Sequence, residues 1–235
     1  MTDDAPRVDK PEKPHHLEHR KRLRTRFLKD MGAHMEDYEL LELLLCQTIP
    51  RRDVKPLAKS LIAKFGSFGG VLSADATRLN AEPGLGETSV VGLKIVQQSV
   101  IRLLRQEIEG AHVLSSWQAV VDYCRAAMGR EKIEQFRLLF LDNRNRLMAD
   151  EVQQRGTVNH TPLYPREVVK RALELGASAL IMVHNHPSGD PTPSKADIDM
   201  TRDVRDALSK VDIRLHDHII VAKSEFRSLK TDGYI

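Results

Sequence analysis

Two histidines and an aspartate within one short stretch carry the clearest chemical signal in the 235-residue sequence. An apolar run, residues 179–183, leads directly into His184, and His186 follows two positions later. Alternate residues at the end of a strand point to the same side, so the two imidazoles can converge. A proline-rich loop follows, and the first turn of the next expected helix returns Asp197 toward them. Two imidazoles, one carboxylate and an open fourth position are the usual ligands of a catalytic zinc ion.

Simpler interpretations exist for the separate parts of this stretch. Histidines in a loop are often solvent-exposed polar residues, and Ser194 could be an ordinary helix N-cap. The complete pattern, His-x-His-Pro-x-Gly-x-Pro-x-Pro-Ser-x-x-Asp, is far more specific than its parts, and it resembles the JAMM motif of the JAB1/MPN metallopeptidase superfamily. Together with its flanking segments, residues 164–169 and 217–221, the stretch closely resembles the RadC branch, the UPF0758 family.

Hydrolysis at such a site also needs a base. A glutamate is the usual choice, because its carboxylate can take a proton from water and pass it to a leaving group. The resemblance places this glutamate after the first helix of the domain and at the start of the next strand, where Glu134 stands. Three other glutamates compete for the role: Glu131, Glu151 and Glu167. The resemblance also implies that Ser194 polarises the scissile carbonyl or holds the tetrahedral oxyanion, which does not exclude capping of the helix.

The remaining histidines and the other hydrolase motifs add little. His216 and His218 flank Asp217, and the expected arrangement is a buried imidazole bonded to a carboxylate. The alternative role for His218 is to hydrogen-bond and orient a side chain that binds the metal. The sequence lacks the His-Glu-x-x-His pattern, the Pro-Cys-x-x-Cys pair of zinc deaminases, a Walker loop and a nucleophile elbow. The corresponding reaction classes are therefore excluded.

Composition restricts the broad class of the protein. Apolar residues make up 41%, enough for the core of one large domain or two small ones. The formal net charge is only +3, from 36 Lys plus Arg against 33 Asp plus Glu, so the total charge identifies no partner. Cys46 and Cys124 lie far apart, which favours a reduced, cytoplasmic protein over a disulfide framework. The sequence contains neither an apolar run of membrane-spanning length nor a signal-peptide pattern.

The N-terminal half is expected to be helical. Residues 1–16 are polar and weakly patterned, which predicts a disordered tail. An all-α domain over residues 17–110 follows, beginning with a basic helix at 17–28 that includes Arg20 and Arg22. Such a basic run is usually a solvated face, and its alternative role is attraction of phosphate. Further helices are predicted at residues 37–46, 53–65, 73–79 and 89–107.

A glycine turn in this domain suggests contact with phosphate. Gly84 and Gly86 permit a tight turn, and the helix that follows exposes unpaired amides at its N-terminus. The turn resembles the hairpin of helix-hairpin-helix modules, which bind the DNA backbone without reading bases. Lys94 and Arg22 would add positive charge, so the expectation is weak, sequence-independent DNA binding. A plain helix-helix turn explains the four-residue pattern equally well.

The second domain, residues 113–235, mixes helices and strands. Helices are expected at residues 117–128, after a cap at Ser115 or Ser116, at 165–175, closed by Gly176, and at 195–208. Strands are expected at residues 136–142, from 147 to 152 or beyond, at 179–183, and at 213–218, 219–222 and 226–228, with a hairpin turn at 143–146. Residues 153–160 could be strand or loop. The resulting domain is α+β or three-layer α/β around a mixed sheet, as the MPN resemblance also implies.

These observations favour a zinc-dependent hydrolase of the JAMM metallopeptidase type, acting on a peptide or isopeptide bond. Zn²⁺ would bind His184, His186 and Asp197, with Glu134 as general base. The alternative is a DNA-associated repair or recombination factor. In that case the metal domain acts on nucleic acid or is structural, and the N-terminal hairpin binds DNA. Neither the substrate nor the oligomeric state follows from the sequence.

Overall fold

The computed structural model describes residues 15–155, 163–223 and 225–235. The expected disordered tail, residues 1–16, lies almost entirely outside the described residues, and so does the end of the segment 153–160. The chain forms two compact units, Met1–Val96 and Gln97–Ile235. The division falls inside one long helix, whereas the boundary expected from the sequence follows the end of that helix. None of the described helices is long and apolar enough to cross a membrane.

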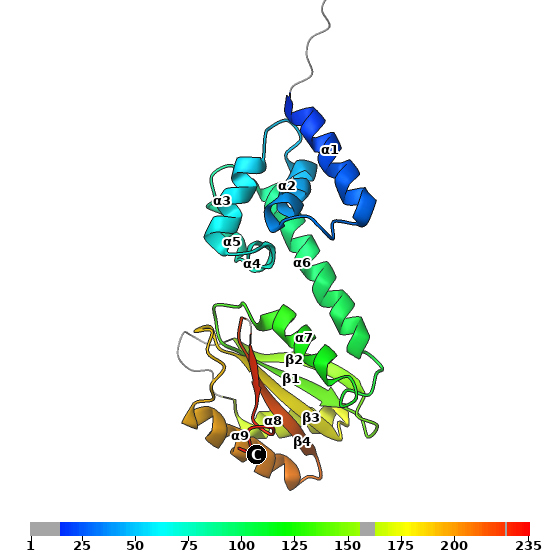
Figure 1. Cartoon of the computed structure of the whole chain (residues 1–235). Helices are drawn as coiled ribbons and strands as arrows, with labels where there is room; N and C mark the ends of the chain where they lie inside the picture. Colours follow the sequence, from blue (N-terminus) through cyan, green and yellow to red (C-terminus); the bar gives the residue numbers. More distant parts are fainter. Residues whose placement is uncertain (1–14, 156–162, 224) are drawn as a thin grey trace, which may run out of the picture. The chain divides into compact units, whose positions relative to one another are not determined.

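The described part of the first unit is helical (Figure 1). Its helices are α1 (His15–Asp30), α2 (Asp37–Thr48), α3 (Lys55–Phe65), α4 (Phe68–Ser73), α5 (Ala76–Asn80) and the first part of α6 (Glu87–Ile108). Leucines from the apolar faces of α2, α3, α5 and α6, among them Leu41, Leu61, Leu79 and Leu93, form one buried cluster. The pattern of apolar residues at helical spacing therefore predicted this core correctly.

The prediction of a single helix at residues 73–79 is wrong. One short helix, α4, ends at Ser73, and a second, α5, begins at Ala76. Ser67 caps α4, where its hydroxyl accepts from the amide of Gly70, and Asp75 caps α5 by accepting from the amides of Thr77 and Arg78. An N-cap residue takes an extended conformation that ends the preceding helix. Asp75 therefore begins a new helix and is not part of a continuous one.

The basic face expected on the first helix also needs a correction at Arg20. Its side chain is buried and donates hydrogen bonds to the carbonyls of Cys46, Ile49, Pro50 and Arg52. These carbonyls lie at and just after the C-terminus of α2, where backbone acceptors lack helical partners. The Arg20 guanidinium satisfies them and is not available to phosphate.

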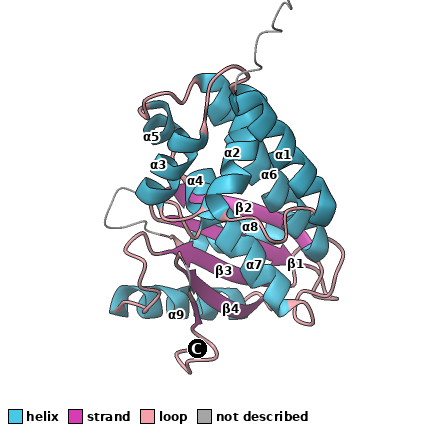
Figure 2. Ribbon diagram, turned by 45° about the horizontal axis from the view of Figure 1, so that its top comes forward, coloured by secondary structure: helices cyan, strands magenta, loops and turns pink. Residues whose placement is uncertain are grey.

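The second unit places helices on both faces of a five-stranded mixed sheet (Figure 2). Its elements are α7 (Trp117–Met128), β1 (Gln135–Leu141), β2 (Leu147–Arg155), α8 (Pro165–Leu175), β3 (Ala179–Asn185), α9 (Lys195–Ser209), β4 (Arg214–Val221) and β5 (Phe226–Ser228). The strand order is β2-β1-β3-β4-β5, in which β3 and β4 are parallel and the other neighbours antiparallel. This arrangement confirms the expected mixed sheet.

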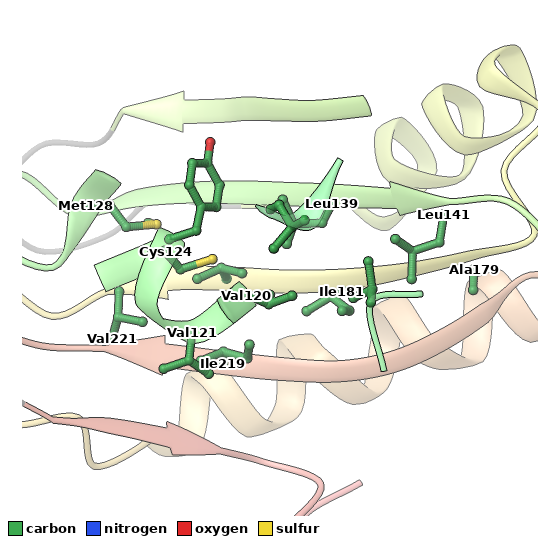
Figure 3. Packing of buried hydrophobic residues seen from close by; sticks show 14 residues of the cluster. Val120, Val121, Cys124, Met128, Leu139, Leu141, Ala179, Ile181, Ile219 and Val221 are labelled. Atoms are coloured by element: carbon green, nitrogen blue, oxygen red, sulfur yellow. The ribbon is translucent and has the colours of Figure 1, made fainter. Parts of the chain in front are cut away.

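The two faces of the sheet bury separate clusters of apolar side chains. Figure 3 shows the first, in which Val120, Val121, Cys124 and Met128 of α7 pack against Leu139, Ile181, Ile219 and Val221 of the sheet. The second joins Leu138, Leu180 and Met182 of the sheet to Val168 and Ala172 of α8 and to Val204 and Leu208 of α9. Because helices cover both faces of the sheet, side chains that alternate along β1 and β3 are buried on either face. Residues 138–141 of β1 and 179–183 of β3 therefore read as continuous apolar runs.

Three local expectations in this unit are wrong. Residues 213–222 do not form two strands, because β4 is a single strand that pairs along β3, with one register shift at His216. The Ser116 side chain makes no capping hydrogen bond to α7, and the Ser115 hydroxyl donates to the carbonyl of His112. The strand expected to stop at Val183 continues through His184 to Asn185, because both residues remain paired with β4.

A buried polar cluster next to the α7 side of the sheet was not foreseen. Arg137 of β1 donates from Nη1 to both carboxylate oxygens of Asp150 on β2, at 2.7 Å each, and to the Tyr123 hydroxyl at 2.9 Å. The Tyr123 hydroxyl in turn donates to Asp150, whose side chain is 1% exposed. Burial, together with the bond to Asp150, raises the pKa of Tyr123, which therefore remains a donor.

We expect Asp150→Ala to lower the free energy of unfolding by roughly 3–5 kcal/mol, because it leaves the Arg137 guanidinium buried without its anion. Chemical denaturation measures this change. Glu167→Ala, which removes the exposed partner of Arg166, is the control and should change stability little. The double variant Arg137→Met/Asp150→Leu should recover much of the loss. If the double variant loses as much unfolding free energy as Asp150→Ala does, the charge-burial explanation is contradicted.

Candidate metal centre

The side chains of His184, His186 and Asp197 come together at the end of β3 and the start of α9, as their spacing predicted. His184 is the penultimate residue of β3 and is fully buried, and His186 follows the end of the strand. Their Nε2 atoms lie 2.9 Å apart. Asp197, on the first turn of α9, places Oδ1 3.4 Å from His184 Nε2 and Oδ2 3.6 Å from His186 Nε2.

These separations fit one tetrahedral metal ion. Ligand atoms about 2.0–2.1 Å from zinc at tetrahedral angles lie roughly 3.3 Å from one another, and the three observed separations fall on both sides of that value. Within the described residues this is the one group of three His, Cys, Asp or Glu side chains with metal-binding geometry. The donor set, two imidazoles and one carboxylate, leaves a position for water or substrate.

Burial and charge affect the three groups differently. Burial lowers the pKa of His184 well below its usual value, and the neighbouring His218 adds to this effect. Burial acts in the same direction on His186, but Asp197, the Asp190 carbonyl and Glu134 outweigh it, so the pKa of His186 is raised. For Asp197 burial opposes ionisation, yet the bonds to His186 and Ser194 and the field of His184 hold its pKa below the usual range. The site therefore favours one anion beside neutral His184.

Ser194 holds the carboxylate of Asp197 in a reciprocal cap. The Ser194 hydroxyl and amide donate to Oδ2 of Asp197 at 2.6 and 2.7 Å, and the hydroxyl accepts from the Asp197 amide at 3.1 Å. Ser194 is an exposed residue. Capping is the role that the hydrogen bonds give Ser194, and its expected role toward a scissile carbonyl stays a prediction.

The register of the sheet brings Glu134 to the same site. Phe136 pairs with His184 across the antiparallel strands β1 and β3. Continued past this pair, the register brings Glu134, two residues before Phe136, beside His186, two residues after His184. The negative charge of Glu134 contributes to the raised pKa of His186, in agreement with this position.

The three competing glutamates occupy other positions. Glu151 of β2 is bound by Arg171, with Oε1 2.6 Å from Nη2. The side chain of Glu167 is exposed on α8 beside Arg166. Glu131 is exposed in the loop before β1. Of the four glutamates, Glu134 is the one among the main causes of the raised pKa of His186.

Asn185, between the two histidines, was not recognised in the sequence. Its side chain is fully buried and points to the face opposite the histidines. The amide oxygen accepts from the Gln135 amide at 2.9 Å, and the amide nitrogen donates to the carbonyls of Glu131 and Ile133 at 3.2 Å each. Asn185 thus holds both sides of the segment that carries Glu134, which the contiguous His-Asn-His sequence by itself could not reveal.

His218 bonds to the ring nitrogen of His184 that points away from His186 and Asp197. The expected bond between its imidazole and a carboxylate is therefore wrong. Its Nε2 is 2.7 Å from Nδ1 of His184, and its Nδ1 is 2.6 Å from the Thr201 hydroxyl. The adjacent Asp217 carboxylate turns instead to Ser228 and to backbone amides. Burial lowers the pKa of His218 to about 3, so the ring is neutral. The Phe136 ring stacks on His184 with centroids 4.7 Å apart.

The four residues expected to contact DNA lie in the first unit. Arg22 is exposed on α1, and Gly84 has a φ of 86° in the turn before α6, where only glycine is unstrained. The amides of Ser89 and Val90 bond to the carbonyl of Gly86, which therefore begins α6. The Lys94 ammonium donates to the carbonyls of Leu72 and Ala74, at the end of α4. The helix-hairpin-helix assignment and DNA binding stay predictions.

Comparison with known proteins agrees with the geometry. Residues 114–234 match the family described as the RadC-like JAB domain. A UPF0758 protein of Ruegeria pomeroyi is 53% identical over 218 residues, which cover 93% of this chain and 97% of that protein. A UPF0758 protein of Rhodobacter capsulatus is 56% identical over 213 residues, which cover 91% of this chain and all of that protein. The chain belongs to the RadC family. The family resemblance of the motif is thereby confirmed.

We expect Asn185→Ala to cost about 1–3 kcal/mol of unfolding free energy, since it leaves the buried amide of Gln135 and two carbonyls without partners. Hydrogen exchange should show faster exchange of the Gln135 amide than of amides in the centre of β1. Asn185→Asp, which keeps the acceptor but loses the donor, should protect Gln135 better than alanine does. Unchanged protection in the alanine variant would contradict the assigned role.

Proposed function

We propose that this RadC family member is a zinc-dependent hydrolase that cleaves a peptide or isopeptide bond. The observation that supports this most strongly is the convergence of two imidazole Nε2 atoms and one carboxylate, with Glu134 beside them. A structural zinc site is usually closed by four protein ligands, whereas three ligands leave a position for a reacting molecule. The arrangement therefore favours catalysis over a purely structural metal.

The chemistry divides between the metal and the chain. When bound, Zn²⁺ would polarise a carbonyl and lower the pKa of water. Asp197 and the two neutral histidines would hold it with a single negative charge, so the positive field at the fourth position remains. Glu134 would accept the proton of the attacking water and deliver it to the leaving nitrogen. The hydroxyl of Ser194, an exposed residue that bonds to Asp197, would polarise the carbonyl oxygen of the substrate.

Nucleic acid as the substrate or partner is the second proposal. Its support is confined to the first unit, where α1 carries exposed Lys21, Arg22, Arg24 and Lys29. The Arg20 guanidinium and the Lys94 ammonium both donate to backbone carbonyls, which reduces the charge available to phosphate. Binding through so few exposed cations would be weak and sensitive to salt.

The purified full-length protein should contain about one zinc ion per chain, measured by elemental analysis. His184→Ala and Asp197→Ala each remove one of three ligands and should lose the metal. His34→Ala, which removes an exposed histidine in the first unit, should retain it. Full zinc occupancy in both ligand variants would show that the metal binds elsewhere.

Glu134→Gln should separate the base from the ligands. Glutamine keeps the shape and hydrogen-bonding capacity of the side chain but cannot take a proton at neutral pH. Zinc content and thermal stability should stay near those of the wild type, while hydrolysis of a cleavable peptide or isopeptide falls roughly 10²–10⁴-fold.

Glu151→Gln is the matched control, because it makes the same change at a partly exposed glutamate that is paired with Arg171. It should keep its activity under identical conditions. If Glu151→Gln abolishes turnover and Glu134→Gln does not, the base has been assigned to the wrong residue. If neither variant differs from the wild type, general-base catalysis by Glu134 and by Glu151 is excluded.

A further inference from the structure

A chain of hydrogen bonds runs from His184 back to the residue that supplies the carboxylate. His184 Nδ1 is 2.7 Å from His218 Nε2, and His218 Nδ1 is 2.6 Å from the Thr201 hydroxyl. The Thr201 hydroxyl in turn lies 2.5 Å from the carbonyl oxygen of Asp197, one helical turn earlier in α9. His184, His218 and Thr201 are all fully buried, so water does not compete for these bonds.

The carbonyl at the end of this chain determines the direction of every bond in it. A carbonyl oxygen can only accept, so the Thr201 hydroxyl must give its single proton to Asp197. The Thr201 oxygen then accepts from Nδ1–H of His218. A neutral His218 with its proton on Nδ1 presents a lone pair at Nε2, so Nδ1–H of His184 must be the donor.

We propose that Thr201 and His218 are positioning residues that hold His184 in the Nδ1–H tautomer, with the lone pair of Nε2 turned toward His186 and Asp197 for a metal ion. The metal part of this inference rests on the proposed zinc site. The tautomer part concerns the metal-free protein and does not.

His186 reaches the same tautomer by a shorter route. Its Nδ1 lies 2.8 Å from the carbonyl oxygen of Asp190, which again can only accept. His184, by contrast, has no loop carbonyl at its Nδ1, because the buried strand β4 supplies His218 there. When both rings are neutral, as metal binding requires, these two independent arrangements leave both Nε2 atoms as acceptors 2.9 Å apart. Two lone pairs that face each other repel unless a cation lies between them, which explains why the geometry suits a metal ion.

The arrangement also couples the ligands. The carboxylate of Asp197 faces the site, while its carbonyl anchors Thr201 at the usual i−4 position of a helical threonine. Phe136 stacks on His184 and lies against His218, at 4.7 and 5.7 Å between ring centroids, and this restricts rotation of both imidazoles. Removal of such an outer partner typically lowers metal affinity about 10–100-fold.

The matched variants are Thr201→Val, which keeps the shape but removes the hydroxyl, and Thr201→Ser, which keeps the hydroxyl. In the metal-free full-length protein, labelled with ¹⁵N-histidine, long-range ¹H–¹⁵N spectra identify the protonated ring nitrogen, and the spectrum of His184→Gln assigns the signal. We expect His184 to carry its proton on Nδ1 in the wild type and in Thr201→Ser, and to lose this preference in Thr201→Val. Protonation on Nε2 in the wild type would overturn the proposal.

Zinc affinity, measured by competition with a chromophoric chelator, gives the second readout. Thr201→Val should bind zinc about 10–100-fold more weakly than the wild type, and Thr201→Ser within a few-fold of it. Equal affinity of the valine variant would overturn the role of Thr201 toward the metal. Absence of zinc binding in a wild type whose His184 is protonated on Nδ1 would refute the proposed zinc site, while the tautomer assignment would stand.

Discussion

The pairing of β3 on both of its sides is the constraint on which the candidate site depends. On one side β1 runs antiparallel, so that Phe136 meets His184 and the chain before it carries Glu134 toward His186. On the other side β4 runs parallel and brings His218 behind His184. A register slip of one residue would turn His184 to the α7 face and Asn185 into the site. The apolar residues that precede His184 in β3, buried on both faces, make such a slip costly.

The site combines a buried environment with a small number of polar groups that are fully bonded. Four of these residues are inaccessible to solvent: His184, His218, Thr201 and Asn185. Their side-chain polar atoms have hydrogen-bond partners, apart from His184 Nε2, which faces the other two candidate ligands. In such surroundings a group left without a partner is costly. The geometry of the ligands is therefore held by the same bonds that keep these polar groups stable in the interior.

Asn185 and Thr201 illustrate how the support of the site comes from both faces of the sheet. Asn185 extends toward the α7 side and holds the loop before β1, and Thr201 reaches His218 from α9 on the other side. The proposed base and the proposed ligands are thus positioned by different elements of one domain. The β1–β3 pairing and the hydrogen bonds of Asn185 bring together the segments that carry Glu134 and His184, the two leading residues of the proposed mechanism.

The sequence by itself determined the elements whose signals are local. Apolar periodicity gave the bounds of α7 and α8, and proline at the start and glycine at the end limited α8. The His-x-His and Ser-x-x-Asp spacings identified the three candidate ligands because a strand end and a helix start have fixed geometries. Local signals failed where caps divide a helix, as at Asp75, and where one strand was divided into two, as in β4.

Only the tertiary structure decided which distant residues meet. Residues on separate strands and helices come together through pairing register and packing, and neither is encoded in any single window of sequence. For this reason the sequence could not decide whether His218 pairs with a carboxylate or supports a metal ligand, and it did not reveal the roles of Thr201 and Asn185. It also placed Arg20 on a solvated face, although its guanidinium donates to backbone carbonyls. The motif specified the donors, and the sheet decided what surrounds them.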